Sequence, residues 1–232
     1  MTVKSVAVLG AGSWGSALAH VLAENGHDVN LWTRNEALAH EIQTNSSNER
    51  YLPKASLNKN IRPSTDMVNT ITGTQFVVLA CPSHAVREVL GTARPHLDKQ
   101  TLISTSKGIE ITSDLRMTEV IAEVLDTPNN FQTVALSGPS FAEELVRGLP
   151  TAVVAASLNK NAAVLVQGLF QNGYLRVYTQ PDVAGVELGG ALKNVIALAA
   201  GVSDGILLGN NARAAIITRG LAEIVRLASR LG

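Results

Sequence analysis

The sequence places a glycine fingerprint where a predicted strand becomes a predicted helix. Residues 10–15 read G-A-G-S-W-G, follow the apolar run 6–9 and open the stretch 14–25, whose apolar residues have helical spacing. In such a unit the first glycine permits a tight turn, the second lets a pyrophosphate approach the backbone, and the third lets the helix pack on the strand. Asn25-Gly26 supplies a helix stop, and 28–32 a second strand. A ligand-free glycine turn is the alternative, but the complete unit predicts a dinucleotide-binding βαβ fold.

The residues after the second strand bear on the choice between NADP and NAD. An acidic side chain there would accept hydrogen bonds from the ribose 2′-hydroxyl, whereas this chain has Thr33-Arg34. Because a guanidinium can pair with a 2′-phosphate, the sequence favours NADP and tolerates NAD. Two alternatives stay open: Glu36 as the acidic residue, and Arg34 as a merely solvated charge.

Composition argues against a nucleic-acid-binding protein. Lys plus Arg and Asp plus Glu both number 19, and basic residues are not concentrated in any segment. Only 4% of the residues are aromatic. An electrostatic nucleic-acid footprint is therefore not expected, and small-molecule chemistry is favoured.

Three features predict a cytoplasmic protein without membrane insertion. Cys81 is the single cysteine, so it cannot form an internal disulfide. The N-terminus enters its first strand almost at once, which leaves no room for a signal peptide. The apolar stretch 186–202 is interrupted by Glu187 and Lys193, so we expect a buried helix of a soluble protein instead of a membrane span.

Strand-like and helical patterns alternate along the first three quarters of the chain. Apolar strand-like runs recur at 76–80, 101–104, 133–136, 152–155 and 174–178, with helical patterns such as 85–90 and 115–125 between them. Alternation of this kind predicts a parallel sheet covered on both faces. The expected fold class is therefore α/β, with a doubly wound Rossmann-type sheet.

A second, all-helical region is expected from Pro181 onward. Strand signals cease there, and charged residues at helical spacing mark a helix over 213–230. We therefore divide the chain into a dinucleotide-binding domain, 1–180, and the N-terminal part of an all-helical domain, 181–232. The sequence stops at Leu231-Gly232, and a helix pair alone would leave an apolar face without a partner, so we expect this second domain to be incomplete.

Lys193 is the strongest candidate for acid–base chemistry. It lies among apolar residues in G-G-A-L-K-N-V-I, 189–196, where desolvation should lower its pKa unless a ligand phosphate or a carboxylate opposes that shift. Gly189, one helical turn earlier, could leave room for a ligand against the amine. The alternative is a lysine that snorkels to the surface.

Lys107 and the loop 137–142 follow two further strands, where open α/β sheets place their ligands. Lys107 lies in T-S-K-G, which suits an anion but lacks the glycine spacing of a Walker loop. The loop S-G-P-S-F-A offers the backbone amides from Ser140 onward to a phosphate or carboxamide. An ordinary surface lysine and a simple capping serine are the alternatives.

Other reactive side chains do not form a second site in the sequence. The loop 137–142 is not a nucleophile elbow, because Ala142 replaces the second glycine and all five histidines precede Ser140. His84 is interpreted as a capping-region residue. Glu143-Glu144 are adjacent on a predicted helix, so they cannot form a catalytic carboxylate pair. No histidine pair has metal-ligand spacing, so no protein-bound metal is expected.

Several of these motifs together resemble NAD(P)-dependent glycerol-3-phosphate dehydrogenase of the bacterial type. The resemblance runs essentially from end to end, and S-D-G at 203–205 and N-A-R-A-A at 211–215 extend it into the helical region. It rests on the following segments: 10–15 (G-A-G-S-W-G), 82–84 (P-S-H), 106–108 (S-K-G), 137–142 (S-G-P-S-F-A) and 190–194 (G-A-L-K-N).

The resemblance implies reversible hydride transfer between NADP or NAD and dihydroxyacetone phosphate, giving sn-glycerol 3-phosphate for glycerophospholipid synthesis. It implies Lys193 as the catalytic acid/base. Substrate contacts are implied for Lys107, Gly138 and Ser140. Cofactor contacts are implied for Ser13, Trp14, Arg34, Lys107 and Ala142, beside Gly10, Gly12 and Gly15 of the fingerprint. In the family a later segment supplies an aspartate and an Arg-Asn pair, which leaves the activity of the given chain open.

Two other functions fit parts of the sequence. A β-hydroxyacid dehydrogenase would have an asparagine one helical turn after the lysine, whereas here Asn194 is adjacent and Ala197 occupies the later place. A non-catalytic NADP-binding sensor would need the glycine fingerprint but not Lys193. The small-molecule phosphate substrate is therefore favoured, while the sequence leaves a homodimer open.

Overall fold

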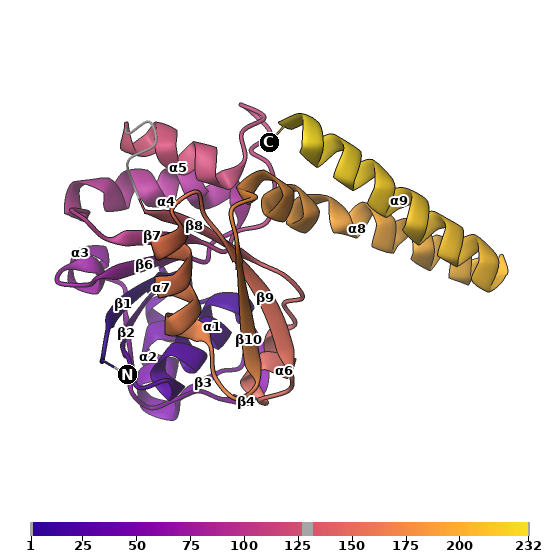
Figure 1. Ribbon diagram of the computed structural model, residues 1–232. Helices are drawn as coiled ribbons and strands as arrows, with labels where there is room; N and C mark the ends of the chain where they lie inside the picture. The colour runs from indigo at the N-terminus through magenta and orange to yellow at the C-terminus, as the bar shows by residue number, and fades with distance from the viewer. Residues whose placement is uncertain (1, 127–131, 232) are drawn as a thin grey trace.

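The computed structural model describes residues 2–126 and 132–231, in which one large sheet forms the centre of the molecule (Figure 1). Its strand order is β10-β9-β8-β7-β6-β1-β2-β5. These strands are β1 (Ser5–Leu9), β2 (Asp28–Trp32), β5 (Ile61–Ser64), β6 (Phe76–Leu79), β7 (Thr101–Ser104), β8 (Thr133–Ser137), β9 (Thr151–Ala156) and β10 (Leu175–Gln180). A separate hairpin pairs β3 (Ser47–Asn48) with β4 (Leu52–Ser56). The predicted α/β Rossmann-type fold is confirmed, although β5 and the hairpin were not expected.

Helices cover both faces of the sheet because successive strand residues point to opposite sides. In β1, Val6 and Val8 join one buried cluster, while Ala7 and Leu9 join the other. The first cluster is covered by α1 (Ser13–Glu24), α2 (Glu36–Asn45), α6 (Ala142–Val146) and α7 (Lys160–Phe170). The second is covered by α3 (Met67–Ile71), α4 (Val86–Ala93) and α5 (Met117–Leu125). The sheet is therefore doubly wound, as the alternating pattern predicted.

The expectation of an entirely parallel sheet is wrong at one place. Strands β8 and β9 pair antiparallel, and β10 then pairs parallel with β9. Helix α6, between β8 and β9, has only five residues and rises about 7 Å, whereas a five-residue strand is about 16 Å long. The chain consequently does not return to the starting edge before β9 begins. Strands β2, β1, β6, β7 and β8 still run in one direction, so their carboxyl ends share an edge.

Two long helices follow the sheet and project away from it as an antiparallel pair (Figure 1). Helix α8 (Val183–Gly205) packs on β8 near its start and on α9 (Gly209–Leu231) along its length. A side chain at Gly220 would collide with Ile196, so this glycine permits the close helix contact. The chain end proposed as a helix stop includes Gly232, which lies outside the described residues.

The prediction that 186–202 forms a buried helix is wrong for the described chain, although the segment is helical. Val195, Leu198 and Val202 on α8 and Leu221 and Val225 on α9 are all more than half exposed, because the two helices cover only one face of each other. The predicted unpartnered apolar face is therefore present. By length and composition alone, α8 could cross a membrane, but the core helix of a soluble protein passes the same test.

Candidate functional site

The three glycines of the fingerprint occupy three different environments. Gly10 has φ of +123°, and a Cβ there would lie 2.7 Å from the Ala80 carbonyl oxygen. A Cβ at Gly15 would overlap the Gly10 carbonyl oxygen, so the helix start packs directly on the turn. A Cβ at Gly12, by contrast, would meet no atom within 4 Å. Only the second glycine therefore faces open space, as close approach of a ligand requires.

The N-terminus of α1 provides amides for an anion. Gly12 stands at the N-cap without a side-chain cap, and the first turn holds no acidic residue. Ser13 is exposed beside it, and Trp14 is partly buried against the core. Uncapped first-turn amides and the helix dipole favour a bound pyrophosphate at this position.

Asn48, which sequence reasoning missed, anchors the glycine turn from the β3–β4 hairpin. Its side chain is fully buried, and Nδ2 donates to the Ala11 carbonyl oxygen at 3.0 Å and to Ser16 Oγ at 2.8 Å. Its Oδ1 accepts from the Tyr51 amide at 3.2 Å. These bonds join the hairpin to the turn and to the first turn of α1, so Asn48 helps to fix the turn's shape.

Arg34 follows β2 on the same sheet edge, and its side chain is 70% exposed. Its nearest acidic partner is Glu88, at 4.0 Å and also exposed. An exposed pair at this distance holds a side chain only weakly, so the guanidinium can reach a ligand. Glu36, the competing residue, begins α2, where Asn35 Oδ1 accepts from the Leu38 amide.

Lys107 and the β8–α6 loop meet at the carboxyl edge of the sheet. Lys107 Nζ donates to the Gly138 carbonyl oxygen at 2.9 Å and to Ser140 Oγ. Gly138 has φ of +151°, and a Cβ there would lie 2.9 Å from the Ala152 carbonyl oxygen, so this position requires glycine. Burial lowers the pKa of Lys107, and the charge of Lys193 lowers it further. The cluster thus holds a half-buried cation beside a hydroxyl.

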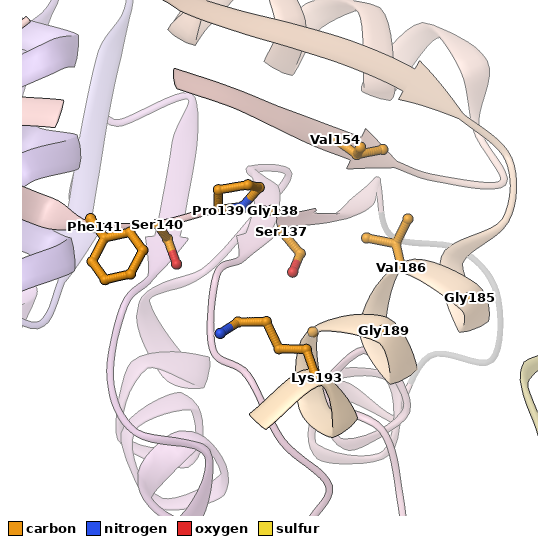
Figure 2. Close-up of a pocket in the computed structure, with 11 residues that line it drawn as sticks. Ser137, Gly138, Pro139, Ser140, Phe141, Val154, Gly185, Val186, Gly189 and Lys193 are labelled. Atoms are coloured by element: carbon orange, nitrogen blue, oxygen red, sulfur yellow. The ribbon is translucent and has the colours of Figure 1, made fainter. Parts of the chain in front are cut away.

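Lys193 faces the same cluster from α8. It lines a cleft of about 460 Å³ with Ser137, Gly138, Ser140, Phe141 and other residues (Figure 2). Helix α8 comes close because Gly190 has no side chain: a Cβ there would lie 2.6 Å from Ser137 Oγ. Gly189 faces open space, as its predicted role of leaving room for a ligand requires. Lys193 therefore lines the cleft, and Lys107 donates to two of the residues that line it.

The expected desolvation of Lys193 by apolar neighbours is wrong for the described chain. Its side chain is exposed, and Nζ donates to Asn194 Oδ1 at 2.8 Å. Among its apolar neighbours in sequence, Leu192 is only partly buried and Val195 is exposed, so they leave the Lys193 side chain exposed. Lys193 therefore lines the cleft as an exposed side chain.

The remaining candidate residues divide between core and surface. Ala142 is buried against α1, so its side chain serves packing. His84 is exposed in a short 3-10 turn before α4. Cys81 is a buried free thiol whose pKa is raised by burial. Within residues 2–126 and 132–231, His, Cys, Asp and Glu form no group of three that could hold a metal.

Comparison with known proteins now decides the family. The model described as "NAD-dependent glycerol-3-phosphate dehydrogenase N-terminus" matches residues 5–163, and the corresponding C-terminus model matches residues 182–232. The chain belongs to the NAD-dependent glycerol-3-phosphate dehydrogenase family. The predicted resemblance is thereby confirmed, and with it an NAD(P)-dependent oxidoreductase that acts on a small phosphate substrate.

Relatives and solved structures agree with this assignment. A glycerol-3-phosphate dehydrogenase [NAD(P)+] from Lysinibacillus sphaericus is 51% identical over 99% of this chain and 68% of its own length. The Bacillus subtilis protein of the same name is 48% identical over 99% of this chain and 67% of its own. The crystal structure of a glycerol-3-phosphate dehydrogenase from Coxiella burnetii is 38% identical with a TM-score of 0.90, covering 99% of this chain and 70% of that one. The chain thus spans about two thirds of its relatives' length.

Alanine substitutions at two fingerprint glycines are expected to affect different properties, namely stability at Gly15 and NADPH binding at Gly12. Gly15→Ala forces the helix start away from the turn and should lower the free energy of unfolding by about 1–3 kcal/mol. Gly12→Ala meets no atom, so it should change stability by less than about 1 kcal/mol while it obstructs the dinucleotide. Denaturant unfolding and fluorescence titration with NADPH measure the two effects. Unweakened NADPH binding by Gly12→Ala would contradict the prediction that the dinucleotide occupies the open space at Gly12.

Loss of the Asn48 donor is expected to loosen the glycine turn. Asn48→Asp keeps the shape but turns a carboxylate oxygen toward the Ala11 carbonyl, so it should lower the free energy of unfolding by about 1–3 kcal/mol and weaken NADPH binding. The control is Asn60→Ala, at an exposed asparagine in the turn between β4 and β5. Calorimetric titration measures the affinity. Unchanged affinity in Asn48→Asp would show that the turn keeps its shape without this anchor.

Proposed function

We propose that this chain carries the dinucleotide site and the proton donor of an enzyme that interconverts dihydroxyacetone phosphate and sn-glycerol 3-phosphate. One observation carries the proposal: Lys193 and Ser140 line one cleft, and Lys107, which follows β7, donates to Ser140 and has its pKa lowered by burial and by the charge of Lys193. A dianionic phosphate ester with an adjacent carbonyl matches two cations and a hydroxyl.

For the dinucleotide, the supporting observations lie along the carboxyl edge of β1 and β2. The pyrophosphate would lie on the amides that begin at Ser13 and Trp14, over the open face of Gly12. Arg34 would pair with the 2′-phosphate of NADP, while NAD would bind without that contact. The backbone at Ala142, where α6 begins, would meet the nicotinamide end of the cofactor. When bound, the nicotinamide supplies the hydride.

For the substrate, Lys107, Gly138 and Ser140 would form the binding cluster. In the described chain, Lys107 Nζ donates hydrogen bonds to the Gly138 carbonyl oxygen and to Ser140 Oγ. An anionic ligand there would offset the repulsion between the two ammonium groups, which lowers the pKa of Lys107. A negatively charged ligand would therefore stabilise the cluster more than a neutral one.

Lys193 would act as the general acid in the direction of reduction. As the substrate carbonyl is reduced its oxygen becomes negative, and an ammonium within reach can donate a proton to it. The same amine would take the proton back in the direction of oxidation. Lys193 and Ser140 line the same cleft (Figure 2), so the substrate carbonyl would lie between α8 and the edge of the sheet.

The domain division, the compartment and the assembly complete the proposal. We place the boundary at 180/181, since β10 ends at Gln180 and α8 begins at Val183. A cytoplasmic enzyme without nucleic-acid partners or membrane insertion fits the balanced charge and the unpaired Cys81. We propose a homodimer as the assembly of the full-length protein.

Removing the Lys193 amine should abolish most turnover while it spares cofactor binding. General acid catalysis is worth about a hundredfold to ten-thousandfold, so Lys193→Ala in the full-length protein should lower kcat by at least about a hundredfold with nearly unchanged NADPH affinity. The assay follows reduction of dihydroxyacetone phosphate with each reduced nicotinamide.

The matched control is Lys160→Ala, at an exposed lysine that begins α7. Added primary amines should partly restore turnover to Lys193→Ala but should leave the control unchanged. Near-normal turnover of Lys193→Ala would refute the proton donor. NADPH binding without turnover by the unmodified full-length protein would instead support the sensor.

Replacing Arg34 should separate the two cofactors. Loss of a charge-assisted pair costs about 1.5–3 kcal/mol, so Arg34→Ala should weaken NADPH binding about tenfold or more and change NADH binding less than about twofold. Glu88→Ala, which removes the exposed partner of Arg34, serves as the control and should not weaken NADPH binding. Equal losses for both cofactors would contradict the 2′-phosphate contact.

A further inference from the structure

A buried carboxylate joins the beginning of α8 to the beginning of α5. Glu187 is only 9% exposed. Its Oε1 accepts from the Thr118 amide at 2.9 Å, and its Oε2 accepts from Thr118 Oγ1 at 2.6 Å and from Arg116 Nη1 at 3.3 Å. Three donors from one helix end therefore converge on a single side chain of another helix.

These contacts make Glu187 a cap for α5 supplied from elsewhere in the fold. Arg116 stands at the N-cap of α5, and a guanidinium has no acceptor atom for the first-turn amides. The α8 carboxylate satisfies the Thr118 amide instead, and lies at the positive end of the helix dipole. Without Glu187, the amide and the Arg116 charge would lose a partner in a largely buried place.

Burial raises the pKa of Glu187, whereas the Thr118 hydrogen bonds and the Arg116 charge oppose the rise. Glu119, which faces Glu187 from the same helix end, adds to the rise and pairs with Arg116 itself. A buried carboxylate held among charged neighbours tolerates few alternative positions. The contact of Glu187 with Thr118 and Arg116 therefore fixes the orientation of α8 relative to α5.

The same helix carries Lys193 six residues further on, about 9 Å along the axis. Between the two lies Gly190, where a Cβ would lie 2.6 Å from Ser137 Oγ and 3.7 Å from Lys107 Cγ. Helix α8 is thus fastened at Glu187 to α5 and rests at Gly190 on the end of β8. Two points of attachment before Lys193 fix both the direction of α8 and its distance from the cleft.

We propose that Glu187 is a positioning residue, which holds α8 so that Lys193 reaches the cleft beside Lys107 and Ser140. This inference rests on the proposed role of Lys193. Glu187 does not line the cleft; it acts through the helix.

The experiment compares five variants of the native full-length protein, one of which combines Glu187→Ala with Thr118→Val. Glu187→Ala removes the cap, Glu187→Gln keeps the volume and one acceptor, and Thr118→Val removes one donor from the opposite side. Glu223→Gln is the control, at a partly exposed carboxylate of α9 that pairs with Arg219 and Arg226, far along the chain from the cleft residues. For each we measure kcat with dihydroxyacetone phosphate, NADPH affinity by fluorescence titration, and amide hydrogen exchange at the start of α5 and in α1.

Misplacing a catalytic group by about 1 Å can cost about a hundredfold, so Glu187→Ala should lower kcat about 10- to 100-fold. NADPH affinity should change less than about twofold, because the dinucleotide site lies on β1 and β2. Thr118→Val should lower kcat less, and adding it to Glu187→Ala should cause no further loss, since both act on one contact. Hydrogen exchange should accelerate at the start of α5 but not in α1.

Three results would overturn the inference. They are unchanged kcat in Glu187→Ala, a loss of NADPH affinity as large as the loss of kcat, and fully additive effects of the two substitutions. If Glu187→Ala does not fold, unchanged kcat in Glu187→Gln together with accelerated exchange in α5 would also overturn it. Failure of the proposed function is distinct, because it appears as normal turnover in Lys193→Ala whatever Glu187 does.

Discussion

The close contact between α8 and the carboxyl end of β8 is the constraint on which the site depends. Lys107 lies in the loop after β7 and Lys193 belongs to the helix pair, and nothing local in either segment brings the two together. The missing side chain at Gly190 allows the helix to reach Ser137, and the buried Glu187 fixes the helix direction. Proximity of the two amines is thus a consequence of packing, and their mutual repulsion is a cost that an anionic ligand offsets.

The sheet supplies the second half of the site through strand direction. Strands β1, β2, β6, β7 and β8 are parallel, so the glycine turn, Arg34, Lys107 and the loop after Ser137 all lie on one edge. In open α/β sheets, dinucleotides bind along the edge where the carboxyl ends of the parallel strands lie. The antiparallel β9 lies beyond this group and contributes Val154 to the wall of the cleft. The edge therefore presents phosphate-binding amides at one end and the lysine pair at the other.

Much of this could be predicted from sequence because its causes are local. The strands and the glycine turn follow from apolar runs and from a motif whose glycines each have a steric purpose. The direction of β9 was not predictable, since it depends on how far a five-residue α6 carries the chain. The exposure of Lys193 was missed for a related reason: apolar neighbours in sequence do not tell which faces of a helix other elements cover. Asn48 and Glu187 were missed because their partners lie 32 and 69 residues away.

The most direct test of the account is a crystal structure of the full-length protein with oxidised dinucleotide and glycerol 3-phosphate. The account predicts that Lys193 Nζ lies within hydrogen-bond distance, about 3 Å, of the substrate's secondary hydroxyl oxygen. It also predicts that Lys107 and Ser140 contact the same ligand, with α8 still capped onto α5. A substrate bound elsewhere, or a Lys193 side chain that turns from the ligand toward solvent, would contradict it.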